Sequence, residues 1–279
     1  MKEIPLLGAH VSIAGGLEKA LMRGHELGCT AVQIFTKNAN RWKERHVDDE
    51  EIRRFEATKK ETGLRCVISH SSYLINLASH NRDFYGKSIE AMVNEVRRCD
   101  ALGITCIVLH PGSHRGWGER VGVRTIAAAL NEVHAQTERR RGMIALETTA
   151  GQGTAVGYRL EQIARIMDKV HDASRIALCL DTCHVFAAGY DFRTDETYEK
   201  LLHDIDAVIG MDKLAVIHVN DSKTPCGSRV DQTAMKISER GSSERNPSDG
   251  LWRMNGFDIF RKSSRRRDWG RIWREIAKT

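Results

Sequence analysis

Short apolar runs alternate with longer amphipathic segments over most of the chain. The runs have strand length, and the segments between them repeat apolar residues at helical spacing. Seven strands are expected at Leu6–Ser12, Ala31–Phe35, Arg65–His70, Thr105–His110, Met143–Thr148, Ile176–Asp181 and Leu214–Asn220, and helices at 16–27, 48–62, 86–102, 120–139, 158–170 and 195–208. This alternation indicates an α/β protein with a parallel sheet.

The number of repeats favours one particular α/β architecture, the TIM (β/α)₈ barrel. Barrels of this kind commonly need about 250 residues, and this chain has 279. Seven strands are found, so the eighth must come from residues 232–279. The best candidate there, Phe257-Asp-Ile-Phe260, is short, which makes strand eight doubtful. We therefore expect the first and seventh strands to remain open edges of an unclosed sheet.

Residues that can bind metals stand at the ends of successive predicted strands. In a parallel barrel these ends meet at one edge, where active sites lie. A single His after a strand is usually an ordinary polar residue, and Asp181 alone could equally be a helix cap before a surface His. Recurrence in the same phase favours a metal site, with imidazole and carboxylate ligands typical of Zn²⁺ or Mn²⁺. The residues at the strand ends are His10, His70, His110, Glu147, Asp181, His184 and His218. They outnumber the three ligands of one catalytic zinc, which predicts a multinuclear cluster.

More specific motifs surround these residues. They are Gly8-Ala-His-Val-Ser-Ile-Ala-Gly-Gly16, Phe35-Thr-Lys-Asn38, His70-Ser-Ser-Tyr-Leu-Ile-Asn-Leu77, Leu109-His-Pro-Gly-Ser-His114, Leu146-Glu-Thr-Thr-Ala-Gly-Gln-Gly153, Leu180-Asp-Thr-Cys-His-Val-Phe-Ala-Ala-Gly-Tyr-Asp191, His218-Val-Asn-Asp-Ser-Lys223 and Gly227-Ser-Arg-Val-Asp231. Together they resemble the endonuclease IV family of zinc-dependent apurinic/apyrimidinic endonucleases. The resemblance runs in order from residue 6 to 231, about four fifths of the chain.

The resemblance implies a TIM barrel with three Zn²⁺ ions. It implies a DNA-repair enzyme that cuts the backbone 5′ to an abasic site, leaving a 3′-hydroxyl and a 5′-deoxyribose phosphate, and that trims blocked 3′ ends. By position, His70 and His110 would hold one zinc, and the catalytic Glu147 would bridge it to a second. Asp181 and His218 would complete the second, and His184 and Asp231 would hold the third.

The expected partner is double-stranded DNA with abasic sites or blocked 3′ ends, bound by a monomer. Residues 35–42 and Ser72-Tyr73 match the family's groove-inserting loops, which implies DNA contacts from Lys37, Asn38, Arg41 and Tyr73. Enzymes that act on a lesion inside a duplex must expose it, and inserted side chains fill the gap. Without the resemblance, a solvated basic loop and a core tyrosine are the simpler interpretation.

Composition bears on the expected cellular compartment of the protein. The seven cysteines are odd in number and scattered, so no disulfide framework is indicated. No apolar run approaches the roughly 20 residues that a membrane span needs, and the N-terminus lacks a signal-peptide core. We expect a reduced, cytoplasmic protein without a membrane partner.

The last 48 residues differ from the rest in composition. Residues 232–279 hold 12 Lys and Arg against 6 Asp and Glu, so their net charge of +6 equals that of the whole chain. The predicted organisation is therefore a barrel domain at 1–231 and an aberrant, poorly ordered basic tail at 232–279. The family's pattern also ends here. Thr233 stands where a histidine ligand of the third zinc is expected, and the late Glu of the second zinc is absent.

A frameshift near residue 232 is our interpretation of the tail. The codons of the tail can be read in a frame shifted by two nucleotides. In that frame the codons for Ser238–Glu244 permit the family's Ile-Gly-Glu-Gly-Phe-Ile-Gly, those for Met235-Lys236 permit His-Glu, and those for Ser263–Arg266 permit Ile-Ile-Glu-Thr. Three matches in one register are hard to attribute to chance. Two other hypotheses stay open: a metal-dependent sugar isomerase or epimerase with a similar barrel, and a DNA-binding or metal-binding remnant without activity.

Overall fold

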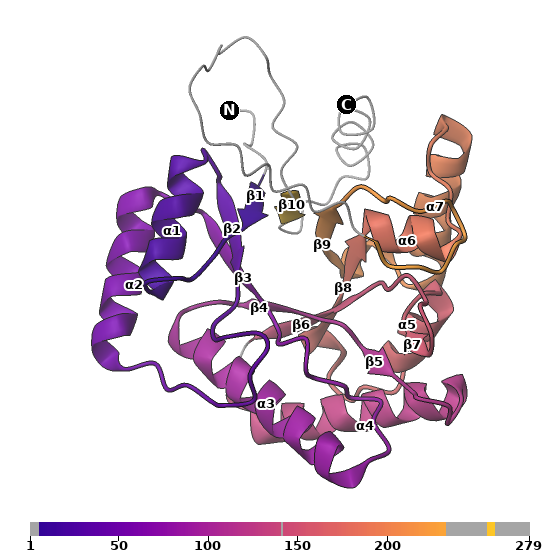
Figure 1. Ribbon diagram of the computed structural model, residues 1–279, viewed down its shortest axis with the longest axis horizontal. Helices are drawn as coiled ribbons and strands as arrows, with labels where there is room; N and C mark the ends of the chain where they lie inside the picture. Colours follow the sequence, from indigo (N-terminus) through magenta and orange to yellow (C-terminus); the bar gives the residue numbers. More distant parts are fainter. Residues whose placement is uncertain (1–5, 141, 233–255, 260–279) are drawn as a thin grey trace.

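Eight strands form a closed barrel in the computed structural model, which describes residues 6–140, 142–232 and 256–259 (Figure 1). In order around the barrel they are β1 (Leu6–His10), β10 (Gly256–Ile259), β9 (Leu214–Val219), β8 (Ile176–Asp181), β6 (Met143–Glu147), β4 (Cys106–Leu109), β3 (Cys66–His70) and β2 (Ala31–Ile34). The TIM barrel predicted from the alternating pattern is confirmed.

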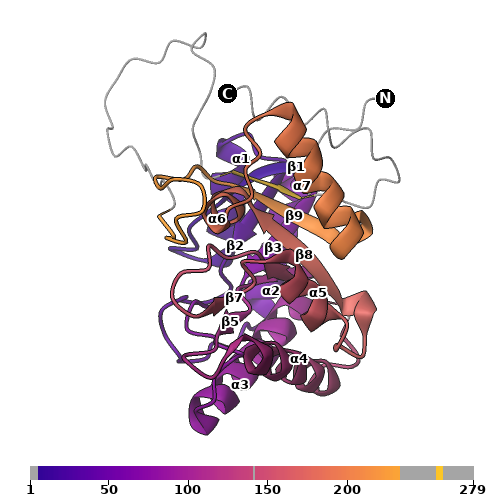
Figure 2. The same cartoon turned by 90° about the vertical axis from the view of Figure 1, so that its right-hand side faces the viewer.

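The helices lie outside the strands, as Figures 1 and 2 show. The longer ones are α1 (Leu17–Glu26), α2 (Asp49–Thr62), α3 (Arg82–Ala101), α4 (Glu119–Gln136), α5 (Leu160–Met167) and α7 (Asp195–Val208). All six predicted helices are present, with ends that differ by a few residues. Side-chain caps explain several helix starts: Asp48 accepts a hydrogen bond from Glu51 N at 2.8 Å, and Asn81 from Phe84 N at 2.9 Å.

Two apolar layers hold this arrangement together. The larger contains the strand residues that face the helices, such as Val32, Ile107 and Leu178, and the apolar faces of the helices. The smaller contains residues from alternate strand positions, among them Ile68 and Val216, and therefore fills the barrel interior. Because parallel strands are buried on both faces, they appear in the sequence as continuous apolar runs.

The closing strand β10 corrects one expectation. Its four residues pair antiparallel with both β1 and β9, for example Gly8 with Phe257 and Phe257 with His218. The expectation that the first and seventh predicted strands remain open edges is therefore wrong, because this short segment satisfies both edges. β10 differs from the other seven strands, which pair with one another in parallel. The predicted poor order of the rest of the tail concerns residues outside the described ranges.

Several small elements gather around the C-terminal edge of the barrel. The two-stranded sheet of β5 (Gly112–Ser113) and β7 (Ala155–Val156) follows β4 and β6, and the short helix α6 (Thr182–Ala188) follows β8 directly. At the opposite edge, single 3₁₀ turns at Ala173–Arg175 and Met211–Lys213 precede β8 and β9. In Figure 2, α6 and the β5–β7 pair lie on the same side of the barrel. Within the described ranges, no helix has the length and apolar character needed to cross a membrane.

Candidate metal centre

Glu147 is the centre of a cluster of four histidines at the barrel edge. It ends β6 and is 2% exposed. One carboxylate oxygen, Oε2, lies 3.1 Å from His70 Nε2 and 2.9 Å from His110 Nε2. The other, Oε1, lies 2.9 Å from His218 Nδ1 and 3.5 Å from His184 Nδ1. His70 and His218 lie in β3 and β9, and His110 and His184 follow β4 and β8, so the barrel brings Glu147 into contact with a residue 77 positions away.

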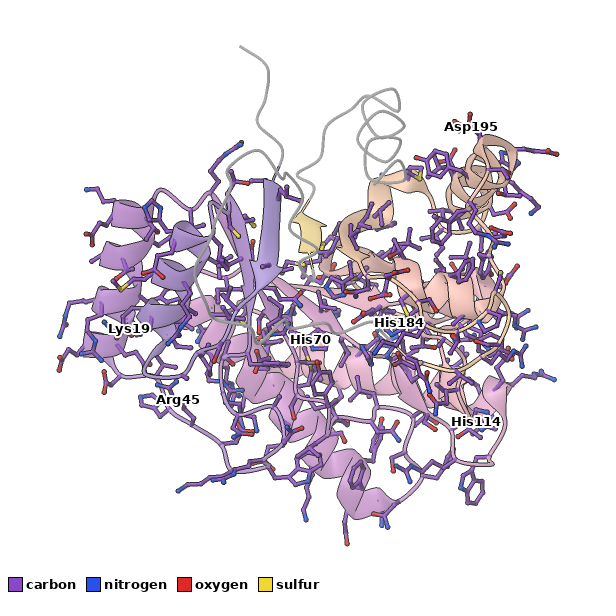
Figure 3. The ribbon with its side chains drawn as sticks, turned by 45° about the horizontal axis from the view of Figure 1, so that its top comes forward. Lys19, Arg45, His70, His114, His184 and Asp195 are labelled. Carbon is purple, nitrogen blue, oxygen red and sulfur yellow. The ribbon has the colours of Figure 1, made fainter. Side chains whose placement is uncertain are left out.

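Asp181 and Asp231 extend the cluster away from His70. Asp181 Oδ2 lies 3.7 Å from His218 Nδ1, and Asp181 Oδ1 lies 3.7 Å from His184 Nδ1. His184 Nε2 lies 3.3 Å from Asp231 Oδ2. Figure 3 shows His70 and His184 near the centre of the barrel mouth, and Lys19 and Asp195 at the periphery. The seven ligands implied by the family resemblance, from His70 to Asp231, therefore converge on one site.

The placement of His184 differs from the sequence-based interpretation. The sequence placed it at a strand end or, alternatively, on the surface, but it lies in the first turn of α6 and is 5% exposed. Asp181 is the N-cap of this helix and accepts a hydrogen bond from His184 N at 2.9 Å. The alternative interpretation of Asp181 as a cap is thus also correct. One carboxylate oxygen caps the helix, and the other faces His218.

Charge pairing shifts the pKa values of the two buried carboxyl groups in opposite directions. Burial alone would raise the pKa of Glu147, but the charges of His110 and His218 and hydrogen bonds from His110 and His184 hold it well below its usual range. Burial raises the pKa of Asp181, and the nearby charge of Glu147 adds to this. Glu147 is therefore the anionic centre of the cluster.

The pKa values of three buried histidines are shifted in different directions, because burial and the neighbouring carboxylates oppose each other. Burial lowers the pKa of His70. Burial also opposes protonation of His218, but the charge of Glu147 raises its pKa. For His184, the charge of Asp181 and hydrogen bonds to Asp231 and Glu147 outweigh burial, so its pKa is well above the usual value. Such perturbed groups in one cluster are typical of functional sites.

The ligand atoms lie close enough together to hold metal ions. Zn–N and Zn–O bonds of about 2.0–2.2 Å in a tetrahedral arrangement place neighbouring ligand atoms roughly 3.3–3.6 Å apart. The nitrogen–oxygen separations in the cluster, from 2.9 to 3.7 Å, bracket this range. Within the described ranges, three groups bring their ligand atoms within 4.8 Å: His70, His110 and Glu147; Glu147, Cys179 and His218; and Glu147, Asp181 and His184. The site can therefore hold metal ions.

Comparison with known proteins agrees with this architecture. The family model described as "Xylose isomerase-like TIM barrel" matches residues 22–268. A probable endonuclease 4 of Chloroflexus aggregans is 44% identical over 231 residues, which cover 83% of this chain and 81% of the relative. One of Geobacter sulfurreducens is 45% identical over 81% of this chain and 76% of the relative. This chain belongs to the endonuclease IV family.

Solved structures separate the family from more distant barrels. Endonuclease IV from Thermus thermophilus is 33% identical, with a TM-score of 0.73 over 81% of this chain and 80% of that chain. A D-tagatose 3-epimerase-like protein is only 17% identical, with a TM-score of 0.60 over 77% of this chain and 76% of that chain. That second likeness shows a shared fold alone. The sugar epimerase alternative is therefore a distant relative.

The loop after β2 contains three of the four residues expected to contact DNA. Asn38 and Arg41 are exposed. Lys37 departs from the expectation, because it is 4% exposed and its Nζ donates to Arg41 O at 2.7 Å and lies 3.2 Å from Glu44 Oε1. Its ammonium group is thus engaged in holding the loop.

Tyr73, the fourth expected DNA contact, lies at the mouth of the cluster and is 54% exposed. Its ring centroid is 5.3 Å from that of His70 and 6.1 Å from that of His110, and Phe35 packs edge-on against it at 5.4 Å. Burial of part of the ring raises the pKa of Tyr73. An exposed aromatic ring is therefore supported directly beside the predicted metal ligands, in contrast to the core tyrosine of the simpler interpretation.

Sequence reasoning did not single out two polar residues that touch the ligands. Asn220 Nδ2 donates to Asp181 Oδ2 at 2.6 Å. Gln33 is 3% exposed and lies between His10 and His218. The available signal was a glutamine inside the apolar run Ala31-Val-Gln-Ile34, since a polar residue in a buried strand needs a partner. The position of the expected histidine ligand, Thr233, is outside the described ranges.

Proposed function

We propose that this chain is a zinc-dependent DNA-repair endonuclease that cuts the phosphodiester 5′ to an abasic site and trims blocked 3′ ends. The observation that supports this most strongly is the Glu147-centred cluster of His70, His110, His184 and His218. The endonuclease IV relatives support the substrate class. All seven ligands come from one chain, so a monomer suffices.

The cluster divides into three proposed zinc positions, the first two of which would share Glu147. His70 and His110 would hold the first together with Glu147, whose Oε2 faces both. His218 and Asp181 would hold the second together with Glu147, and His184 and Asp231 would hold the third. When bound, zinc would stabilise charge on the phosphate oxygens and activate water near neutral pH.

The protein residues of the site have separate tasks. Glu147 fixes the separation of the first two positions, because its two oxygens face different histidines. Tyr73 occupies the mouth, where an exposed ring can fill the gap left by a missing base. Asn38 and Arg41 are exposed on the adjoining loop and bind phosphates of the duplex. Lys37 contributes by holding that loop through Arg41 O and Glu44.

Cleavage of a duplex with a single abasic site tests the proposal. The zinc-loaded 279-residue chain is expected to cut 5′ to the lesion and leave a 3′-hydroxyl. Removal of zinc by a chelator should abolish the cut, and added zinc should restore it. The same duplex with an intact base is the control. Equal cleavage of both duplexes, or no cleavage of the abasic duplex, would contradict the proposed function.

A further inference from the structure

A chain of three side chains runs from β1 through β2 to the metal cluster. His10 Nδ1 lies 2.9 Å from Gln33 Nε2, and Gln33 Oε1 lies 2.9 Å from His218 Nε2. On its other side, His218 Nδ1 faces Glu147 Oε1 at 2.9 Å. Gln33 is 3% exposed and His218 6% exposed, so water cannot readily replace either contact.

The direction of these hydrogen bonds determines which His218 nitrogen presents a lone pair. A neutral imidazole carries one N–H and one lone pair. The Gln33 carbonyl oxygen can only accept, so it holds the proton of His218 on Nε2. Without zinc, Nδ1 donates to Glu147 Oε1 at 2.9 Å, and on zinc binding this nitrogen would give up its proton and offer its lone pair, while Nε2 keeps the proton held by Gln33.

His10 is the hydrogen-bond partner at the other end of the Gln33 amide. A reversed amide would place the NH₂ group against His218 Nε2, and His218 would then carry its proton on Nδ1. In the orientation seen here, Gln33 Nε2 donates to His10 Nδ1, which requires the His10 proton on Nε2. Within the described part of the chain, His10 Nε2 has no hydrogen-bond partner. The contact with Gln33 is thus the polar interaction through which His10 acts.

The other buried histidines of the cluster are set in a different way. His70 Nδ1 lies 2.8 Å from the carbonyl oxygen of Ser71, and His184 Nδ1 lies 2.8 Å from that of Thr148. Main-chain carbonyls therefore keep these protons on Nδ1 and leave Nε2 for the metal. For His218 the side chain of Gln33 holds the proton, and it does so on Nε2. This contact can be removed by substitution of Gln33, whereas a main-chain carbonyl cannot.

We propose that Gln33, held by His10, is a positioning residue that keeps His218 in the Nε2-protonated form and so prepares Nδ1 as a zinc ligand. This inference rests on the proposed zinc site and goes beyond it, because it assigns a role to two residues that are not ligands. Partners of this kind orient a ligand histidine, and their loss typically lowers metal affinity by about 10–100-fold.

The variants are Gln33→Leu, which has a similar size without hydrogen-bonding groups, and Gln33→Glu, which keeps an acceptor beside His218. The full 279-residue chain is loaded with Zn²⁺ in each form. Competition with a chromogenic chelator measures zinc affinity, and ¹⁵N ring correlations from labelled histidine report which nitrogen carries the proton. His70 and His184 are internal controls, because their main-chain partners remain.

Gln33→Leu is expected to weaken zinc binding by about 10–100-fold and to change the ring correlations of His218 alone. Gln33→Glu is expected to restore the parent's tautomer and most of its affinity. An unchanged His218 tautomer and affinity in Gln33→Leu would overturn the inference. Equal changes at His70 and His184 would do so as well, since they indicate general disruption.

The outcome is separable from that of the proposed function. A zinc-loaded parent that does not cut abasic DNA would remove the function, while a tautomer change confined to His218 would still support the positioning role. A parent that cuts normally together with a Gln33→Leu chain of unchanged His218 tautomer would remove the positioning role alone. A parent that binds no Zn²⁺ overturns both.

Discussion

The two ends of the cluster differ in how the chain supplies their ligands. At one end, His70 and Glu147 close two barrel strands and are 5% and 2% exposed. At the other end, His184 is buried, but its partner Asp231 comes from a loop and its side chain is 42% exposed. Asp231 N is held by Gln152 Oε1 at 3.1 Å, and Thr233 stands where the family's histidine is expected.

This difference separates the ligands that the barrel strands position from the one that a loop positions. Strand register places His70, His110 and Glu147, because neighbouring strands are locked by main-chain hydrogen bonds. Asp231 depends on the path of the chain after β9, and the family's pattern ends directly after this residue. We therefore expect the His70 end to bind zinc tightly and the His184–Asp231 end to bind it weakly.

Glu147→Gln should have the largest effect on cleavage. The neutral amide cannot balance the charge of two metal ions. Its NH₂ group would also replace one of the two carboxylate oxygens that now face His70 and His218. Cleavage of the abasic duplex is expected to fall by at least about a hundredfold, while DNA affinity in a gel-shift assay stays within about threefold. Activity above roughly a tenth of the parent's would argue against the bridging role.

Restoring the family's reading frame after residue 232 should have the next largest effect. It would supply the missing His and Glu ligands and replace the antiparallel β10 by a parallel eighth strand. We expect at least about tenfold faster cleavage, more zinc per chain and a higher melting temperature. The control is the chain with the same restored tail, in which the restored His and Glu ligands are changed to alanine.

If the present chain matched the restored one in cleavage, zinc content and melting temperature, the frameshift interpretation would be wrong. The antiparallel pairing of Gly256–Ile259 would then be a genuine way of closing the barrel. The edges of β1 and β9 are already satisfied here, so the predicted gain comes mainly from the ligands.

Tyr73→Ala should reduce cleavage by roughly tenfold, since stacking of an aromatic ring on a base contributes about 1–3 kcal/mol. Tyr73→Phe keeps the ring and its contact with Phe35 and should remain within about threefold of the parent. The measurement is the cleavage rate at low DNA concentration. A Phe variant as impaired as the Ala variant would assign the role to the hydroxyl instead of the ring.

Acidification should release zinc from the two ends at different pH values. The raised pKa of His184 means that protons already compete with zinc above the usual titration range of histidine, near pH 6.5. The lowered pKa of His70 delays that competition to a lower pH. Zinc retained per chain, measured between about pH 8 and pH 5, should fall in two steps. The His184→Ala chain should lack the first step, and its persistence would contradict this assignment.

The sequence predicted the parallel part of the barrel well, for a physical reason. Strands buried on both faces appear as apolar runs such as Ile176–Leu180, and the run ends where a polar ligand begins. The closing strand Gly256–Ile259 is offset by one residue from the predicted candidate Phe257–Phe260, but its antiparallel pairing could not be predicted in the same way. Its pairing is decided by the two free edges that it meets, and these lie far away in the sequence.

The convergence of the candidate ligands could be predicted from the sequence, but the residues that contact them could not. His and carboxylate residues in one phase along successive strands are enough to indicate the cluster from the sequence alone. The sequence did not indicate that Lys37 is buried against Glu44, because a basic residue in a loop is usually exposed. Nor could it reveal that Gln33 meets His218, a contact between residues 185 positions apart.

The central claim is that strand-end ligands hold metal at Glu147 even though the tail departs from the family. Zinc per chain, measured in the purified parent and in a His70→Ala, His110→Ala double variant, tests it most directly. Both substitutions lie outside the helices and outside β10. A melting curve verifies that the double variant is folded. We predict zinc in the parent and a loss of at least one equivalent in the variant. Equal zinc content in the two folded proteins would contradict the account.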